Sequence, residues 1–173
     1  ILGPMFCGKS EELERIMRIY DLYTTTIGIN TKKDDRYGEN GIISHDGRVY
    51  PAVRIDNLDD IKNNEKYKAA EVVGIDEANH FPEIYDFVVD QLTTTNKKFI
   101  VAGLNADKDM NSFGNFLKLI PKADEIIMLK GICVRCKNGT PASFTAAIVN
   151  FDGQTHIGGK ESYETVCREH WQE

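Results

Sequence analysis

The first ten residues carry the pattern that most restricts the fold of this chain. Gly3 and the run Gly8-Lys9-Ser10 have the spacing G-x-x-x-x-G-K-S, which is typical of a loop that binds phosphate. Its glycines let successive main-chain N–H groups point at one anion, the lysine reaches the outer phosphates, and the serine hydroxyl binds Mg²⁺. The pattern therefore predicts a nucleotide site at the very start of the chain.

The residues around this loop match a strand before it and a helix after it. Ile1 and Leu2 suit the end of a strand, and residues 10–23 carry apolar side chains at helical spacing. The residues expected on this helical face are Leu13, Ile16, Met17, Ile19 and Tyr20. A helix N-terminus would add its dipole to the phosphate site. The alternative is an ordinary glycine turn before a helix. Because the chain starts on the strand of the motif, we expect a few natural residues to precede Ile1.

Composition limits the class of protein. The chain has 173 residues, of which 41% are hydrophobic and 28% charged, as in a globular protein of one domain with a small appendage. A net charge of −6 argues against a nucleic-acid partner, which usually selects a basic surface. We see no signal peptide and no apolar run long enough to cross a membrane. We therefore expect a cytoplasmic protein without a membrane partner.

Apolar runs alternate with helical patterns along most of the chain. The runs expected as strands are 25–30, 71–76, 99–104 and 125–134, and the expected helices are 57–68 and 83–96. Continuous rather than alternating apolar strands are typical of a parallel sheet that is covered on both faces. The order predicts an α/β fold of the P-loop type, with a mainly parallel sheet flanked by helices.

Two carboxylates lie at the end of the expected strand at residues 71–76. Asp76 ends the apolar stretch 71–76, at the edge of the sheet where the phosphate loop should also lie, and can bind Mg²⁺ beside Ser10. Glu77 comes next and should point to a different side, where it can address a nucleophile. The alternative is a solvated strand end. These residues alone do not decide between an ATPase, which orients water, and a kinase, which takes a proton from an acceptor hydroxyl.

A charged loop follows the expected strand at residues 25–30. It contains Lys33, Asp34 and Arg36, and an arginine there can neutralise charge on a transferred phosphoryl group. The alternative interpretation is a solvated run of charges.

Three cysteines and a histidine have the spacing of a metal site. Cys133 and Cys136 form a C-x₂-C pair, and Cys167 and His170 form a C-x₂-H pair. Together they predict a closed, structural Cys₃His zinc site, with disulfides as the alternative. A turn at Asp152-Gly153 predicts a hairpin between the two pairs.

Taken in order, the segments GPMFCGKS, KDDRY, IDEANHF, CVRC and IGGKESYETVCREH resemble the thymidine kinase family of the cytosolic, bacterial and poxviral type. The resemblance runs from residue 1 to about residue 171. It implies a P-loop α/β domain over residues 1–130 and a zinc-held lasso subdomain over residues 131–173 that closes over the nucleoside. It also implies transfer of the γ-phosphoryl group of Mg-ATP to the 5′-hydroxyl of thymidine or deoxyuridine, usually by a homotetramer that responds to the end-product triphosphate.

The resemblance assigns roles by position. Glu77 becomes the base that takes the 5′-hydroxyl proton, Lys9 holds phosphate, and Asp34 and Arg36 lie near the reacting phosphoryl group. Ser10 and Asp76 hold Mg²⁺. The residues expected around ATP and its phosphates are Gly3, Pro4, Met5, Phe6, Cys7, Gly8, Lys9, Ser10, Asp76 and Asn79. The residues expected around the nucleoside are Met5, His80, Leu104, Lys108, Phe113, Thr145, Gln154, Thr155, His156, Ile157, Gly158 and Tyr163.

The chain departs from the family pattern near the expected base. His80 and Lys108 stand where the family usually has aromatic residues, and Ala146-Ala147 replaces a basic pair. We therefore expect thymidine phosphorylation with weak discrimination among pyrimidine deoxynucleosides. The alternatives are a related deoxynucleoside kinase with another base preference and a nucleotide-binding zinc module without activity.

Overall fold

The computed structural model describes residues 1–33, 41–43, 49–154 and 156–172. Within this part of the chain, a sheet of four parallel strands lies at the centre, in the order β5-β2-β6-β7. These strands are β2 (Thr26–Thr31), β5 (Ala52–Ile55), β6 (Val72–Ile75) and β7 (Lys98–Val101). All of β6 is buried, as expected for an inner parallel strand. The predicted mainly parallel α/β fold is confirmed.

A second pair of parallel strands contains the N-terminal strand. Strand β1 (Leu2–Gly3) pairs with β8 (Gly103–Leu104), which follows β7 after Ala102. The carboxyl ends of β1 and β6 therefore meet at one edge of the sheet, which is the usual ligand-binding edge of such folds. A short antiparallel pair, β3 (Ile42–Ile43) and β4 (Val49–Tyr50), completes this part of the molecule.

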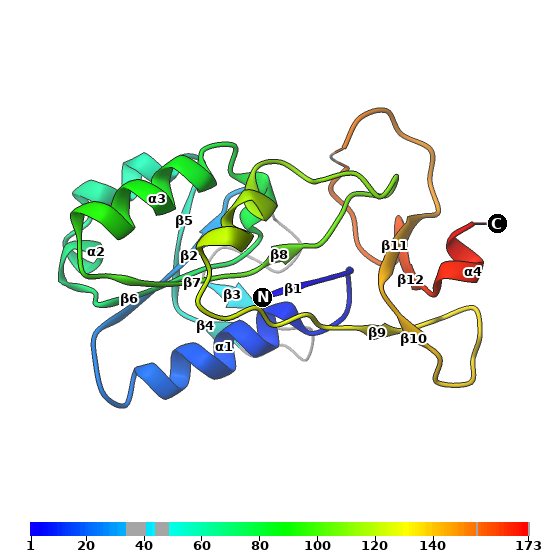
Figure 1. Cartoon of the computed structure of the whole chain (residues 1–173), viewed down its shortest axis with the longest axis horizontal. Coiled ribbons are helices and arrows are strands. Elements are labelled where there is room, and N and C mark those ends of the chain that lie inside the picture. The colour runs from blue at the N-terminus through cyan, green and yellow to red at the C-terminus, as the bar shows by residue number, and fades with distance from the viewer. Residues whose placement is uncertain (34–40, 44–48, 155, 173) are drawn as a thin grey trace.

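Helices cover both faces of the sheet. Helix α1 (Lys9–Tyr20) lies on one face, and α2 (Glu65–Ala69) and α3 (Ile84–Thr94) lie on the other (Figure 1). Three 3₁₀ helices connect these elements: η1 (Leu58–Asn63), η2 (Ala78–His80) and η3 (Phe116–Lys122).

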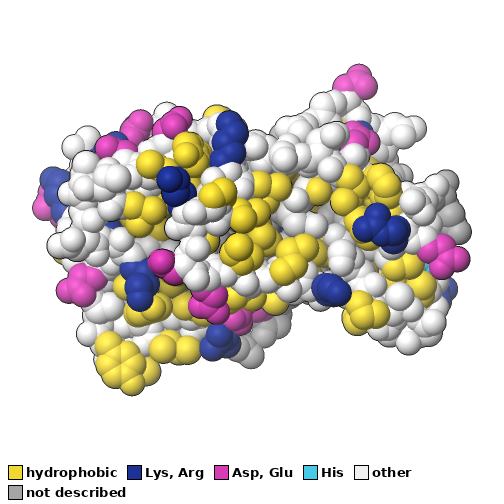
Figure 2. Space-filling view, in the orientation of Figure 1, with side chains coloured by type: hydrophobic (Ala, Val, Ile, Leu, Met, Phe, Trp, Pro, Cys, Tyr) yellow, Lys and Arg dark blue, Asp and Glu magenta, His cyan; other side chains and the backbone are white. Residues whose placement is uncertain are grey.

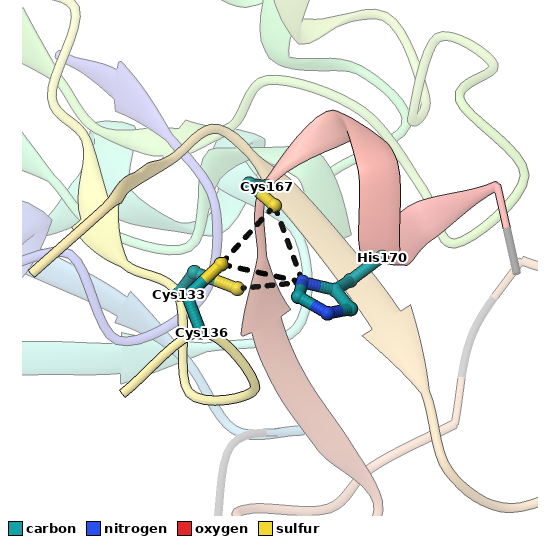
Figure 3. Close-up of side chains that lie close together, drawn as sticks. All are labelled: Cys133, Cys136, Cys167 and His170. Carbon is teal, nitrogen blue, oxygen red and sulfur yellow. Dashed lines mark hydrogen bonds between the residues drawn. The ribbon is translucent and has the colours of Figure 1, made fainter. Parts of the chain in front are cut away.

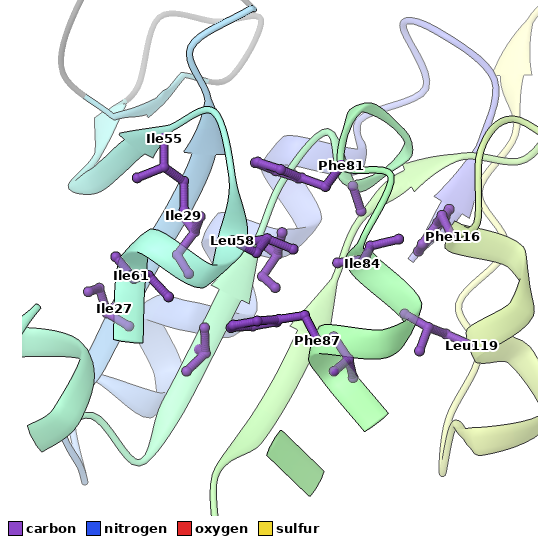
Figure 4. Close-up of a cluster of buried hydrophobic side chains, with 14 of the residues drawn as sticks. Ile27, Ile29, Ile55, Leu58, Ile61, Phe81, Ile84, Phe87, Phe116 and Leu119 are labelled. Carbon is purple, nitrogen blue, oxygen red and sulfur yellow. The ribbon is translucent and has the colours of Figure 1, made fainter. Parts of the chain in front are cut away.

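Alternate residues of the strands feed two separate hydrophobic clusters. On the α3 face, Ile29 packs with Phe81, Ile84 and Phe87 (Figure 4). Ile75 of β6 belongs to the same cluster. Complete burial of each such side chain contributes about 1.5–3 kcal/mol. The cluster therefore fixes β6, and with it the residues that follow β6.

On the opposite face, Leu13 and Met17 of α1 pack with Val72 and Ala102. The contact is close at Gly74, where a Cβ atom would lie 2.8 Å from the Met17 Sδ. A larger residue at this position would therefore displace the Met17 side chain from β6. The contact fixes the helix that starts at the phosphate loop.

The C-terminal region, residues 131–172, has its own small core. Strand β9 (Gly131–Ile132) pairs with β10 (Pro141–Ala142), and β11 (Phe144–Ala147) pairs with β12 (Tyr163–Val166), both antiparallel. Helix α4 (Arg168–Trp171) follows β12 directly. Cys133, Ala142, Phe144 and Val166 form the buried cluster of this region, which lies beside the phosphate-loop end of the sheet in Figure 1.

Several expected elements differ from the structure. The helix expected over 57–68 is broken into η1 and α2, because Asn64 is extended and its side chain caps a new helix by accepting from the N–H groups of Lys66 and Tyr67. The strand expected over 99–104 is interrupted at Ala102, which separates β7 from β8.

The strand expected over 125–134 forms only β9 and a single bridge between Leu2 and Met128, and Ile126 before that bridge is half exposed. The expected hairpin around Asp152-Gly153 is confirmed by the antiparallel pair β11 and β12, but a long loop joins these strands instead of a tight turn. Ile19 was expected on the buried face of α1 but is 46% exposed, because α1 covers the sheet mainly through Leu13 and Met17.

Apolar side chains also reach the surface. Leu92, Ile120 and Ile126 are each at least 40% exposed. Hydrophobic side chains gather across the middle of the face shown in Figure 2. No helix in the described ranges is both long enough and apolar enough to cross a bilayer.

Candidate active site

The phosphate loop lies between β1 and α1 in an unusual backbone conformation. Phe6 and Gly8 have φ angles of 58° and 86°, so the chain turns twice through the left-handed region before α1 begins at Lys9. The Lys9 side chain is buried, and its Nζ donates to the Pro4 carbonyl at 2.6 Å. The loop therefore folds around the side chain of its own lysine.

Asp76 lies beside this loop, at the end of β6. Its carboxylate is almost completely buried and accepts hydrogen bonds from the Ser10 hydroxyl and from the Glu77 N–H, the latter at 2.9 Å. Burial and the neighbouring Glu77 charge raise the pKa of Asp76 to about 7, although both hydrogen bonds favour the ionised form. A hydroxyl and a carboxylate side by side are oxygen ligands of the kind that Mg²⁺ prefers. The donor set therefore fits the predicted magnesium site.

Glu77 is held in a strained conformation. Its φ of 50° and ψ of 39° place a non-glycine residue in the left-handed region, which is uncommon and is concentrated at functional sites. Its Oε2 lies 3.9 Å from the His80 Nε2, and the His80 ring meets Phe113 edge-on at 5.4 Å. The turn after β6 thus directs Glu77 away from the buried Asp76.

A cavity of about 330 Å³ joins these residues to the C-terminal region. From the predicted site it contains Met5, Phe6, Cys7, Gly8, Lys9, Ser10, Glu77, His80, Leu104, Lys108, Phe113, Thr145, Gln154, His156, Ile157, Gly158 and Tyr163. Lys33 of the charged loop lines it as well. Residues predicted for phosphate and for nucleoside therefore share one cavity, although they lie up to about 150 positions apart in the chain.

Some predicted site residues do not line the cavity. These are Gly3, Pro4, Asp76 and Asn79. Asn79 is buried, its Oδ1 accepts from the Leu104 N–H at 3.0 Å, and its Nδ2 has no partner in the described ranges.

Asp34, Arg36 and Thr155 lie outside the described residues. Their roles stay predictions.

Lys108 has specific neighbours at the end of the cavity. Its Nζ pairs with the Asp109 carboxylate at 2.7 Å and lies 5.3 Å from the centre of the Phe151 ring. Phe151 in turn stacks on His156 at 4.9 Å, and the Tyr163 hydroxyl donates to the His156 carbonyl at 2.7 Å. Lys108 therefore lies against the Phe151 ring, which stacks on His156.

The sequence analysis missed three residues of the cavity: Glu11, Ala106 and Asp107. Asp107 is nearly fully buried, and its Oδ2 accepts from the Gln154 Nε2 at 2.7 Å. This bond holds the segment of Gln154 to Gly158 against the loop that follows β8. The sequence around Asp107 carries no motif that would have indicated this contact.

The predicted metal ligands come together in the C-terminal region (Figure 3). The ligand atoms of Cys133, Cys136, Cys167 and His170 all lie within 4.8 Å of one another. The Cys136 and Cys167 sulfurs are 3.7 Å apart, and the His170 Nδ1 lies 3.3–3.5 Å from the three sulfurs. A zinc ion with about 2.3 Å bonds to sulfur in tetrahedral geometry requires sulfurs about 3.8 Å apart. The four donors therefore fit zinc without rearrangement.

The thiols of the cluster differ in their pKa. Desolvation opposes a charge on Cys133, but main-chain N–H groups, including those of Cys167 and Cys136, lower the pKa of Cys133 to about 6. A hydrogen bond to Thr140 favours the Cys136 thiolate, but burial and the neighbouring Cys133 and Cys167 thiols raise the pKa of Cys136 to about 11. A thiolate is the form that binds metal.

Comparison with known proteins gives the family. The sequence model described as thymidine kinase matches residues 1–171. The thymidine kinase of Yaba monkey tumor virus (strain VR587) is 41% identical over 97% of this chain and 90% of its own length. Those of Myxoma virus (strain Uriarra) and Mycoplasma mobile are 37% and 33% identical, each over 97% of this chain and over 92% and 83% of their own lengths. The cavity between the glycine-rich loop, the turn after β6 and the C-terminal region with its Cys₃His cluster thus lies in a chain that belongs to the thymidine kinase family.

Proposed function

We propose that the protein transfers the γ-phosphoryl group of ATP to the 5′-hydroxyl of thymidine, and that it also accepts deoxyuridine. Membership of the family supports thymidine phosphorylation. One observation carries the rest of the proposal: a single cavity is lined by Lys9 and Ser10 of the glycine-rich loop, by Glu77, and by His156 and Tyr163 of the C-terminal region. Donor phosphates and acceptor hydroxyl can then meet at Glu77.

The phosphate end supports a donor nucleotide. Lys9 lies inside a loop whose N–H groups can hold phosphate, and its ammonium would exchange the Pro4 carbonyl for phosphate oxygens. Ser10 and Asp76 would hold Mg²⁺, which when bound neutralises charge on the transferred phosphoryl group. We extend the same proposal to Asp34 and Arg36, by their position in the family pattern.

Glu77 is proposed as the general base. Its carboxylate faces the cavity while the adjacent Asp76 stays buried, so the two acidic residues can serve different partners. A base must lie within hydrogen-bond reach of the hydroxyl from which it takes the proton. A 5′-hydroxyl placed between Glu77 and the phosphate loop satisfies this requirement.

The nucleoside would occupy the end of the cavity near the C-terminal region. Met5, Leu104, Phe113 and Tyr163 supply its apolar sides. Main-chain groups of residues 154–158 are proposed to read the polar edge of the base. The Asp107–Gln154 hydrogen bond supports this role, because it holds that segment over the cavity.

Three further properties belong to the proposal by family resemblance. Zinc is proposed as the structural ion of the Cys₃His cluster, in a lasso subdomain that starts near residue 131. A homotetramer is proposed, and the exposed Leu92, Ile120 and Ile126 support self-association. Feedback by the end-product triphosphate and a cytoplasmic location complete it. Light scattering and inhibition by thymidine triphosphate are the respective tests of the tetramer and of the feedback.

A panel of nucleosides incubated with Mg-ATP tests the reaction itself. We expect stoichiometric ADP and thymidine monophosphate from thymidine, and deoxyuridine monophosphate from deoxyuridine. Thymidine monophosphate formed without ADP would exclude ATP as the donor. Faster turnover of deoxycytidine or of a purine deoxynucleoside would favour a kinase of different base preference.

Replacement of Lys108 by phenylalanine should sharpen base discrimination. A stacking wall contributes about 1–3 kcal/mol per base, and one methyl group in a well-packed pocket is worth about 1–3 kcal/mol. Lys108 pairs with Asp109 and so offers no such wall. We expect a small ratio of kcat/KM for thymidine over deoxyuridine in the parent, which rises several-fold in Lys108→Phe.

The exposed Lys118, outside the cavity, gives a matched control. Lys118→Phe should leave this ratio unchanged. A large parental ratio that Lys108→Phe does not alter would show that Phe151 and His156 already rebuild the wall.

A further inference from the structure

Two threonines of the C-terminal region hold one peptide of the phosphate loop. The Met5 N–H donates to the Thr145 Oγ1 at 3.0 Å, and the Thr165 Oγ1 donates to the Met5 carbonyl at 2.6 Å. Both polar main-chain groups of Met5 are therefore bound by side chains that lie 140 and 160 positions away.

The two threonines form one rigid unit. Thr145 on β11 and Thr165 on β12 are direct partners in the antiparallel ladder, and they are only 5% and 2% exposed. The Thr165 methyl group packs on Gly131 of β9, where a Cβ atom would lie 2.7 Å from it. Thr165 is also only two residues from the metal ligand Cys167. The metal cluster, the strand pair and the Met5 peptide are thus connected through short segments.

The hydrogen bonds to Met5 affect the strained turn of the loop, which follows Met5 directly. Met5 directly precedes Phe6, the first of the two left-handed residues of the loop. A non-glycine residue in this conformation persists only where its surroundings enforce it. The bonds to Thr145 and Thr165 fix the peptide that enters the strained turn, and so contribute to the orientation of the N–H groups that follow.

We propose that Thr165 is a positioning residue for the donor nucleotide. Through its hydroxyl, the metal-binding region sets the geometry of the phosphate loop as well as covering the nucleoside. This inference rests on the proposed function, because it assumes that the loop binds the phosphates of ATP.

The test is Thr165→Val, which keeps the shape and removes the hydroxyl. We expect the KM for ATP and the Kd for Mg-ADP to rise about tenfold, equivalent to about 1.4 kcal/mol. The KM for thymidine should stay within about twofold, because Met5 is only one of four proposed apolar contacts to the nucleoside and makes that contact through its side chain, whereas Thr165 binds its main chain. Thr165→Ser, which keeps the hydroxyl, should restore nucleotide affinity. Thr165→Ala, which places no methyl group against the Met5 carbonyl, should show the same split as Thr165→Val if the valine variant folds poorly.

Thr95 offers a matched control. Its Oγ1 also donates to a main-chain carbonyl, that of Gln91 at 2.7 Å, and accepts from the Lys97 N–H, but at the end of α3 and outside the cavity. Thr95→Val should leave the KM for ATP unchanged. Metal content, measured for every variant, should stay at the parental value.

Three results would overturn the inference. Parental nucleotide affinity in both Thr165→Val and Thr165→Ala would show that the hydroxyl does not position the loop. An equal rise in the KM values for ATP and thymidine would show general loosening instead. A parent that binds no Mg-ADP would refute the proposed function itself, and this inference with it.

Discussion

Glu77→Gln should lower kcat by about 10²–10⁴, the usual effect of removing a general base. Glutamine has nearly the same size, and its amide cannot take the 5′-hydroxyl proton. Glu77 lines the cavity while Asp76 and Ser10 are hydrogen-bonded to each other beside it, so the predicted magnesium ligands stay in place. The Kd for Mg-ADP should therefore change by less than about threefold. Steady-state kinetics and calorimetry measure the two quantities.

The left-handed backbone at Glu77 requires a control for folding. Thermal unfolding of Glu77→Gln should match the parent, because the change leaves the backbone and the side-chain volume nearly intact. Glu65→Gln is the matched substitution at an exposed ion pair, where such pairs contribute little, and it should keep parental turnover. If Glu77→Gln retains turnover within a few-fold of the parent, Glu77 is not the base.

The features that the sequence predicted well are encoded over short spans. The loop between a strand and a helix, and the two pairs of possible metal ligands, follow from fixed spacing within a few residues; the structure places the loop between β1 and α1 and brings the four possible ligands together. The parallel sheet followed from apolar runs such as 71–76, which form buried strands. In each case the local pattern and the tertiary structure agree.

The features that it missed depend on contacts between distant segments. Asp107 gives no sign in the sequence that Gln154 will donate to it, and nothing near Met5 indicates that Thr165 will bind its carbonyl. The region 125–134 looked like a strand because it is apolar and β-branched. It contributes one bridge to β1 and then leaves the sheet to form β9. Pairing partners, not propensity, decided that outcome.

The departures near the base show how a residue type can be predicted to matter without its role being clear. Lys108 was expected to leave a gap in an aromatic wall. In the structure it lies over Phe151, which stacks on His156, so an aromatic residue from the loop between β11 and β12 approaches the same place. The sequence position of Phe151 carries no motif that would have indicated this. The ratio of kcat/KM for thymidine over deoxyuridine in Lys108→Phe therefore tests whether Phe151 and His156 already supply a stacking surface in this chain.

Cys136→Ser should remove most of the bound zinc and unfold the C-terminal region. The parent should carry about one zinc ion per chain, since its four donors already have tetrahedral spacing. A structural zinc site contributes its binding free energy directly to folding, and losing one thiolate should cost several kcal/mol. For a chain of this size, that lowers the Tm by about 10 °C or more. Metal analysis and calorimetry provide the two readouts.

Cys7→Ser is the matched control, because Cys7 lies in the phosphate loop and outside the metal cluster. It should keep about one zinc ion per chain.

Cys136→Ser should also weaken nucleotide binding, since β12 carries both Thr165 and the strand end that leads to Cys167. Mg-ADP affinity should therefore fall together with zinc content, and added zinc should restore both in the parent after chelation. A parent that contains no zinc and joins Cys133 to Cys136 in a disulfide would contradict the assignment. Zinc loss without any change in Mg-ADP affinity would support the assignment of the zinc site, but it would show that this site does not influence the phosphate loop.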